Sequence, residues 1–103
     1  MVDHIEIPGQ ATIVDLLRAL KGDVQKRYKA QLVGICGSQA RGDATKDSDV
    51  DILVDFLEGA TLLDLSGLGD FLEEQLNQKV DVISRRAIRE EIKASVYNDL
   101  IHL

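Results

Sequence analysis

Three aspartates on two apolar segments carry the clearest chemical signal in the sequence. Asp49 and Asp51 are two residues apart in the alternating segment 49–56, and Asp81 lies in a second short apolar segment, 80–83. Because a strand repeats every two residues, a strand here would place Asp49 and Asp51 on the same face. Two carboxylates that close repel each other unless a cation lies between them, and magnesium prefers such oxygen ligands. If the two strands are neighbours, Asp81 reaches the same place, and three carboxylates can hold the two metal ions of a phosphoryl transfer.

A glycine–serine turn follows another apolar run. Residues 32–36 are apolar, Gly37 and Ser38 come directly after them, and residues 38–41 are expected to form a helical turn. Glycine lets the backbone approach a phosphate closely, and the exposed N–H groups at a helix start favour anions. The Ser38 hydroxyl adds a donor, and Arg41 offers a charged fork to phosphate oxygens. Phosphate donors beside metal-binding carboxylates are what the chemistry of a nucleoside triphosphate requires.

Each of these features alone has an ordinary explanation. An Asp-x-Asp pair is most often a solvated strand face, Gly-Ser is most often only a turn, and Arg41 or Asp81 alone is most often a surface side chain. These separate explanations do not account for the presence of all four features in one small chain. We therefore interpret the combination as a site for nucleotide chemistry.

The remaining pattern supplies the elements that would position these residues. Apolar spacing predicts an N-terminal helix that Gly22 interrupts or bends, a leucine-rich helix capped by Thr61, and a last helix capped by Ser84. Three strands are expected, over residues 32–36, 50–56 and 80–83. This order predicts an α/β (α+β) fold in one domain, residues 1–103, with a small mixed sheet of about three strands flanked by helices. The pattern does not fix the order of the strands.

The charge and the composition narrow the class of protein. The formal net charge is −6, and an acidic surface repels a phosphate backbone, so direct binding of nucleic acid is not expected. An acidic chain does complement a basic protein partner. The single cysteine, Cys36, has no partner within the chain, and no segment resembles a signal peptide or a membrane span. We expect a cytoplasmic protein that does not associate with a membrane.

The two motifs together resemble a known family. The segment 37–42, Gly-Ser-Gln-Ala-Arg-Gly, followed by Ser-Asp-Val-Asp-Ile-Leu-Val at 48–54, is similar to the minimal nucleotidyltransferases of the DNA polymerase β superfamily. Ten residues separate Ser38 from Asp49, which is the family pattern of Gly-Ser, ten residues and Asp-x-Asp. The segment around Asp81 resembles the strand that carries the family's third carboxylate. The resemblance extends over nearly the whole chain, and all three acidic positions are filled.

This resemblance implies a role for each residue of the site. Asp49 and Asp51 would bind the magnesium ions that hold the triphosphate. Asp81 would bind the ion nearest the attacking hydroxyl and help to remove its proton. The glycine–serine turn would hold the β- and γ-phosphates, with Arg41 as a further phosphate contact. The reaction would be the attack of a hydroxyl on the α-phosphate of ATP, with release of pyrophosphate.

The resemblance also implies a biological role. Family members of this size are typically the antitoxins of prokaryotic two-protein systems whose other member is a HEPN-domain ribonuclease toxin. They transfer AMP from ATP to a tyrosine of the toxin, which blocks its ribonuclease site. Two alternatives stay open at this point. One is a nucleotidyltransferase that acts on a small molecule or another protein, and the other is a binding-only antitoxin or nucleotide-binding module without turnover.

Two further surface features have no assigned role. The helix after Thr61 carries more apolar side chains than one face needs, at Leu62, Leu63 and Phe71. We expect part of this surface to meet a partner or a second copy of the chain, and the second case would give a homo-oligomer. A basic cluster begins the last helix, at Arg85, Arg86 and Arg89. Whether it contacts a nucleotide or a partner is left open.

Overall fold

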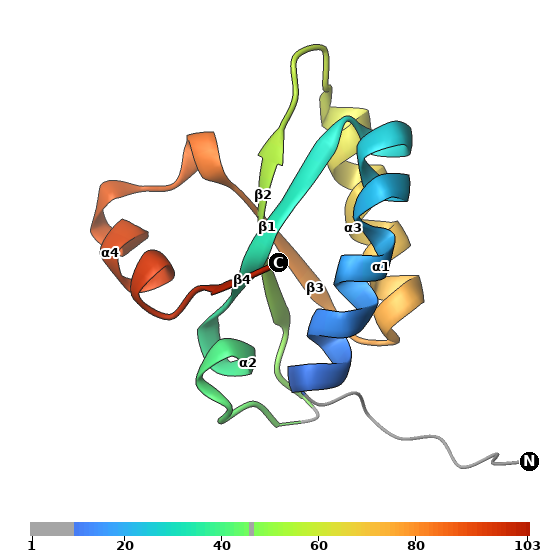
Figure 1. The fold of residues 1–103 in the computed structure, drawn as a ribbon. Coiled ribbons are helices and arrows are strands. Elements are labelled where there is room, and N and C mark those ends of the chain that lie inside the picture. Colours follow the sequence, from blue (N-terminus) through green and yellow to red (C-terminus); the bar gives the residue numbers. More distant parts are fainter. Residues whose placement is uncertain (1–9, 46) are drawn as a thin grey trace, which may run out of the picture.

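The computed structural model describes residues 10–45 and 47–103, which form one mixed sheet covered by helices (Figure 1). The strands are β1 (Ala30–Cys36), β2 (Val50–Phe56), β3 (Val80–Ser84) and β4 (Ile101–His102). The helices are α1 (Gln10–Tyr28), α2 (Gly37–Arg41), α3 (Leu62–Leu76) and α4 (Glu90–Asn98), with a 3₁₀ turn, η1 (Arg85–Ala87), before α4. The predicted fold class is confirmed.

The sheet order is β3-β2-β1-β4. Strand β1 runs antiparallel to both of its neighbours, β2 and β4, whereas β2 and β3 are parallel. Within residues 10–45 and 47–103 the sheet therefore has four strands, one more than the sequence suggested. The additional strand, β4, has only two residues and pairs with β1 at Gly34 and Ile35. It leaves no room beside Gly34, where a Cβ atom would collide with the chain at Leu100 and Ile101.

Helices α1 and α3 pack side by side on one face of the sheet, and α4 lies on the other side (Figure 1). The alternation of β2 explains this arrangement, because Val50, Ile52 and Val54 are all fully buried on the α1 and α3 side. On the side of α4, Leu53 joins Cys36 and Val96 in a second, smaller core. The two cores give β2 one deeply covered face and one face that α4 covers in part.

Helix α3 begins as the sequence predicts. Thr61 caps it in a reciprocal capping box with Asp64. Leu68, Leu72 and Leu76 are fully buried. Leu62 and Leu63, two of the apolar side chains in excess of one helix face, are 82 % and 83 % exposed. The first turn of α3 therefore extends beyond the sheet and contributes nothing to the core.

Two predicted helix boundaries are wrong. Helix α1 runs through Gly22 without interruption, because the burial of Ile13, Leu17 and Val24 on the sheet outweighs the roughly 1 kcal/mol that a helical glycine costs. Ser84 does not cap α4. It ends β3 instead, paired with Val54, and α4 begins six residues later. None of the described helices is long and apolar enough to cross a membrane.

Candidate active site

Parallel pairing of β2 and β3 places two of the predicted carboxylates side by side. Asp51 and Asp81 are direct partners in the register of these strands. Paired residues of neighbouring strands point to the same face of a sheet, so both carboxylates lie on the face that α4 partly covers. Asp51 is half-buried and Asp81 is exposed. Asp49 is exposed and lies just before β2, after a turn in which the Thr45 amide donates a 2.9 Å hydrogen bond to the Ser48 hydroxyl.

The glycine–serine turn lies directly against Asp51. Cys36, the last residue of β1, is the register partner of Asp51, so Gly37 follows beside this carboxylate. Gly37 has a φ of +70°, and a Cβ atom at this position would collide with Oδ2 of Asp51. Glycine is therefore required here for two reasons, its backbone conformation and the space that the carboxylate occupies.

Helix α2 presents the turn as the sequence predicts. It spans five residues and is capped at its C-terminus by Gly42, whose amide donates to the carbonyl of Ser38 at 3.0 Å. The Ser38 hydroxyl makes no hydrogen bond within the described chain, which leaves it available to a ligand. Gln39 is buried, and its amide nitrogen lies 3.4 Å from Oε1 of Gln78, just before β3. This contact ties the turn to the strand that carries Asp81.

A pocket of about 270 Å³ joins these elements. It is lined by Gly37, Arg41, Asp51 and Asp81, and on the α4 side by Ser95 and Asp99. Four of the six predicted site residues therefore surround one hollow, although their segments are up to 44 positions apart in the chain (81 − 37). Ser38 and Asp49 lie at neighbouring positions and do not line it. Ser95 and Asp99 were not predicted as site residues.

Like charges crowd this pocket. Burial raises the pKa of Asp51 above its ordinary value, Asp81 and Asp49 raise it further, and Arg41 acts in the opposite direction. The pKa of the neighbouring Cys36 thiol is raised to about 11, first by burial and then by the surrounding carboxylates. A bound cation would relieve this repulsion. The cluster thus has the electrostatic character of a cation site.

Magnesium fits the carboxylates of the pocket. Within residues 10–45 and 47–103, no three acidic, histidine or cysteine side chains come together in a complete metal cage. Magnesium does not need one, because it is usually held by one or two carboxylates while water and substrate phosphates fill its other positions. Asp51 and Asp81 are two such carboxylates, paired in register beside the glycine–serine turn.

Arg41 is held by two acidic side chains. Its guanidinium lies 3.3 Å from Oδ2 of Asp43 and 3.1 Å from Oδ2 of Asp99, and both contacts raise its pKa. Asp99 ends α4, so this pair connects α2 to α4 across the mouth of the pocket. The sequence could not reveal this ion pair, because 57 residues lie between Arg41 and Asp99 (99 − 41 − 1) and no sequence motif contains both.

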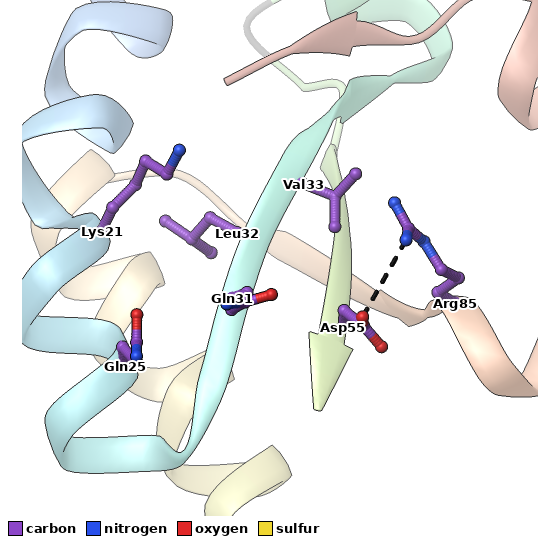
Figure 2. Close-up of a pocket in the computed structure, with 7 residues that line it drawn as sticks. All are labelled: Lys21, Gln25, Gln31, Leu32, Val33, Asp55 and Arg85. Carbon is purple, nitrogen blue, oxygen red and sulfur yellow. Dashed lines mark ion pairs between the residues drawn. The ribbon is translucent and has the colours of Figure 1, made fainter. Parts of the chain in front are cut away.

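The basic cluster lies elsewhere. Arg85 and Arg86 each come within 3.9 Å of Asp55, at the far end of β2. Figure 2 shows Arg85 beside Asp55 in a separate pocket of about 330 Å³, which also includes Lys21 of α1 and Gln31 of β1. None of the three arginines lines the pocket that holds Asp51 and Asp81.

A mixed sheet with a glycine turn and two carboxylates in register defines a nucleotide-handling transferase domain. The chain belongs to the nucleotidyltransferase domain family, whose sequence profile matches residues 17–102. It is 35 % identical, over 91 residues, to the protein adenylyltransferase MntA of Thermococcus cleftensis. The aligned region covers 88 % of this chain and 92 % of that protein.

Solved structures show the same fold. The structure of a protein described as a minimal nucleotidyltransferase has a TM-score of 0.71 at 36 % identity and covers 99 % of this chain and 100 % of that one. An MNT antitoxin, solved in complex with the tri-AMPylated HEPN toxin of Shewanella oneidensis, has a TM-score of 0.66 at 20 % identity. That comparison covers 90 % of this chain and 70 % of the other, and at this identity it supports the fold alone.

Proposed function

We propose that this chain is a magnesium-dependent protein adenylyltransferase. It transfers AMP from ATP to a tyrosine hydroxyl of a HEPN-domain toxin and thereby acts as the antitoxin. The observation that carries the proposal is the register pairing of Asp51 with Asp81 next to Gly37, whose lack of a side chain makes room for the Asp51 carboxylate. The adenylyltransferase relative supports AMP as the transferred group. The fold shared with an antitoxin bound to an AMPylated HEPN toxin supports the acceptor.

Each residue has a role in this proposal. Asp51 and Asp81 would hold magnesium, with Asp49, which is close enough to act on the charge of Asp51, as a further ligand, and the ion would stabilise the negative charge of the triphosphate and of the transition state. The backbone N–H groups that begin α2 and the Ser38 hydroxyl bind the β- and γ-phosphates. Arg41 exchanges one of its two carboxylate partners for a phosphate oxygen, because its exposed guanidinium can turn toward the pocket that it already lines.

The reaction forms one bond and breaks one. The acceptor oxygen bonds to the α-phosphorus of ATP, and the bond from this phosphorus to the bridging oxygen of the β-phosphate breaks, so pyrophosphate leaves. Asp81 lies at the exposed side of the pocket, where it accepts the proton of the attacking hydroxyl before that proton passes to water. The products are an adenylylated tyrosine, pyrophosphate and one proton. A cytoplasmic location agrees with the free thiol of Cys36.

The test is transfer of label from α-labelled ATP. The chain is incubated with magnesium, labelled ATP and a HEPN-domain protein as the candidate acceptor, and the modified residue is located by mass spectrometry. Asp51→Asn and Asp81→Asn are expected to lose at least about 100-fold in rate, since they remove charge stabilisation from the reaction. Asp70→Asn is the matched control, because Asp70 is an exposed carboxylate on α3 outside the pocket.

Three results would contradict parts of the proposal. Label on the HEPN protein that survives both Asp→Asn changes would show that the pocket is not the catalytic site. Bound ATP without any labelled protein would leave a small-molecule transferase or a binding-only module. Label on a residue other than tyrosine would keep the activity and overturn the acceptor group.

A further inference from the structure

A continuous apolar groove leads away from the candidate active site along β3. Its first section is lined by Val82, Ile83, Ile88 and Ile92 and has a volume of about 430 Å³. Ile83 and Ile92 also line the pocket of Asp51 and Asp81, so the groove and that pocket share a wall.

The groove continues as far as the first turn of α3. A second section of about 510 Å³ is lined by Phe56, Leu62 and Ala60 and shares Leu65 and Ala87 with the first. Leu62 is 82 % exposed, and Ile92, at the opposite end, is 46 % exposed. Large side chains exposed at both ends of one apolar track are typical of a surface that another molecule covers.

The floor of the groove is the outer edge of the sheet. Strand β3 is the last strand of the order β3-β2-β1-β4, and within the described residues it pairs with β2 alone. An unpaired strand edge can accept an additional strand through main-chain hydrogen bonds, while pockets beside it select side chains. The shape of the site therefore suits an extended segment better than a helix.

The groove has a single positive charge, that of Arg89. Arg89 is the only charged side chain among the residues that line its two sections. Within the described chain it has no ion-pair partner, whereas Arg85 and Arg86 both approach Asp55. An unpaired guanidinium in an apolar groove favours a ligand that brings a carboxylate to this point.

We propose that this groove, defined by Val82, Ile83, Ile88, Arg89 and Ile92 with Leu62 and Leu65 at its far end, binds an extended segment of the acceptor protein. The segment adds as a strand to the free edge of β3, places an acidic side chain opposite Arg89 and buries an apolar side chain against Leu62. Its other end delivers the acceptor hydroxyl to Asp81, which lies on the same strand. The proposal rests on the proposed function, because it names the docking site of that reaction's protein substrate.

Two matched pairs of variants test it. Leu62→Glu is compared with Leu63→Glu, since both leucines are exposed to the same degree, 82 % and 83 %, on the same helix turn, and only Leu62 lines the groove. Arg89→Glu is compared with Arg86→Glu, whose side chain lies outside it. A glutamate in the first turn of a helix is compatible with the helix dipole, so both leucine variants are expected to fold.

The measurement is the Kd for the candidate HEPN-domain acceptor without ATP, so that it does not depend on catalysis. Leu62→Glu and Arg89→Glu are expected to raise Kd at least about tenfold, while both controls stay within about threefold of the unchanged chain. Hydrogen exchange at the β3 amides is expected to slow when this acceptor binds. Equal Kd values within each pair, unprotected β3 amides, or no binding by the unchanged chain would overturn the proposal.

Two outcomes separate this proposal from the proposed function. Groove-dependent binding without AMP transfer would refute the adenylyltransferase activity and leave the docking site. AMP transfer at the same KM for the acceptor in Leu62→Glu and Leu63→Glu would leave the activity and refute the docking site. If Leu62→Glu instead converts an oligomer of the isolated chain to a monomer, the groove holds a second copy and the proposal is wrong.

Discussion

Replacement of Gly37 by alanine should disable the site by moving Asp51, and Gly42 provides a matched control. Both glycines adopt a positive φ, +70° at Gly37 and +81° at Gly42. A Cβ atom on Gly37 would collide with the Asp51 carboxylate, whereas one on Gly42 would meet nothing within 4 Å. The two alanine variants therefore share the same backbone strain and differ in the displacement of one side chain, the Asp51 carboxylate of the candidate active site.

The structure sets the size of each effect. An L residue in the left-handed region costs about 1–2 kcal/mol. Alanine recovers about 0.4–1 kcal/mol of this by restricting the unfolded chain. Each variant should thus lose about 1 kcal/mol of unfolding free energy, which corresponds to about 4–8 °C in Tm for a small domain. Only Gly37→Ala also moves Asp51, and a displacement of about 1 Å in a site of this kind costs about 100-fold in rate.

The assay combines thermal unfolding with AMP transfer to the proposed HEPN-domain acceptor. Similar Tm values for the two variants, with transfer lost only in Gly37→Ala, are the expected result. If Gly37→Ala transfers AMP as fast as Gly42→Ala, then the contact between the glycine turn and Asp51 has no part in the reaction. If Gly42→Ala loses transfer to the same extent, backbone strain in α2 explains the effect and the reasoning from the collision is refuted.

Three further predictions test the electrostatics, the cap and the thiol. Burial and the neighbouring carboxylates raise the pKa of Asp51 in the folded chain, so ionisation of this group opposes folding. Its contribution to stability is fully present below its ordinary pKa of 3.8 and is lost as the pH rises through the raised pKa. Asp51→Asn should therefore raise Tm at pH 7 without divalent ions, and the gain should shrink as the pH falls toward 4; a lower Tm at pH 7 would contradict the crowding of charge. Thr61→Ala should lower the unfolding free energy by about 1 kcal/mol in urea titrations, because it removes the capping box with Asp64; no change would mean that the box adds nothing in solution. Cys36, which is 2 % exposed and has a pKa of about 11, should react with iodoacetamide at pH 8 at least about 100-fold more slowly than in urea, and comparable rates would show that the site opens readily.

Local sequence signals predicted those parts of the fold that depend on neighbouring residues. Strand β2 has the predicted bounds because its alternation separates a core face from a polar face over seven residues. The cap at Thr61 was predictable because both partners of the capping box lie within four positions. The glycine at position 37 was predicted as a place where the backbone approaches a phosphate, but its contact with the Asp51 carboxylate was not predicted, because Gly37 follows one strand and Asp51 lies in another.

Tertiary contacts decided the parts that the sequence did not predict. Ser84 has a good capping side chain, yet pairing with Val54 extends β3 through it, so the helix starts later. Strand β4 is too short to show alternation and exists because Ile101 and His102 reach the free edge of β1. Asp99 became a neighbour of the site only through its pair with Arg41, which joins two segments that share no sequence pattern.

The two faces of β2 explain how so small a chain can hold a crowded acidic site and still fold. Val50, Ile52 and Val54 face α1 and α3 and are fully buried, so most of the stabilising apolar contact of this strand lies on one side. Asp51 faces the other side, where α4 covers the sheet only in part and leaves a pocket open to water and ions. A carboxylate on the first face would have no access to a cation, and one on a fully exposed face would hold a cation weakly because water screens the charge. The half-covered face provides both access and reduced screening, and we infer that this balance is why the acidic pair lies there.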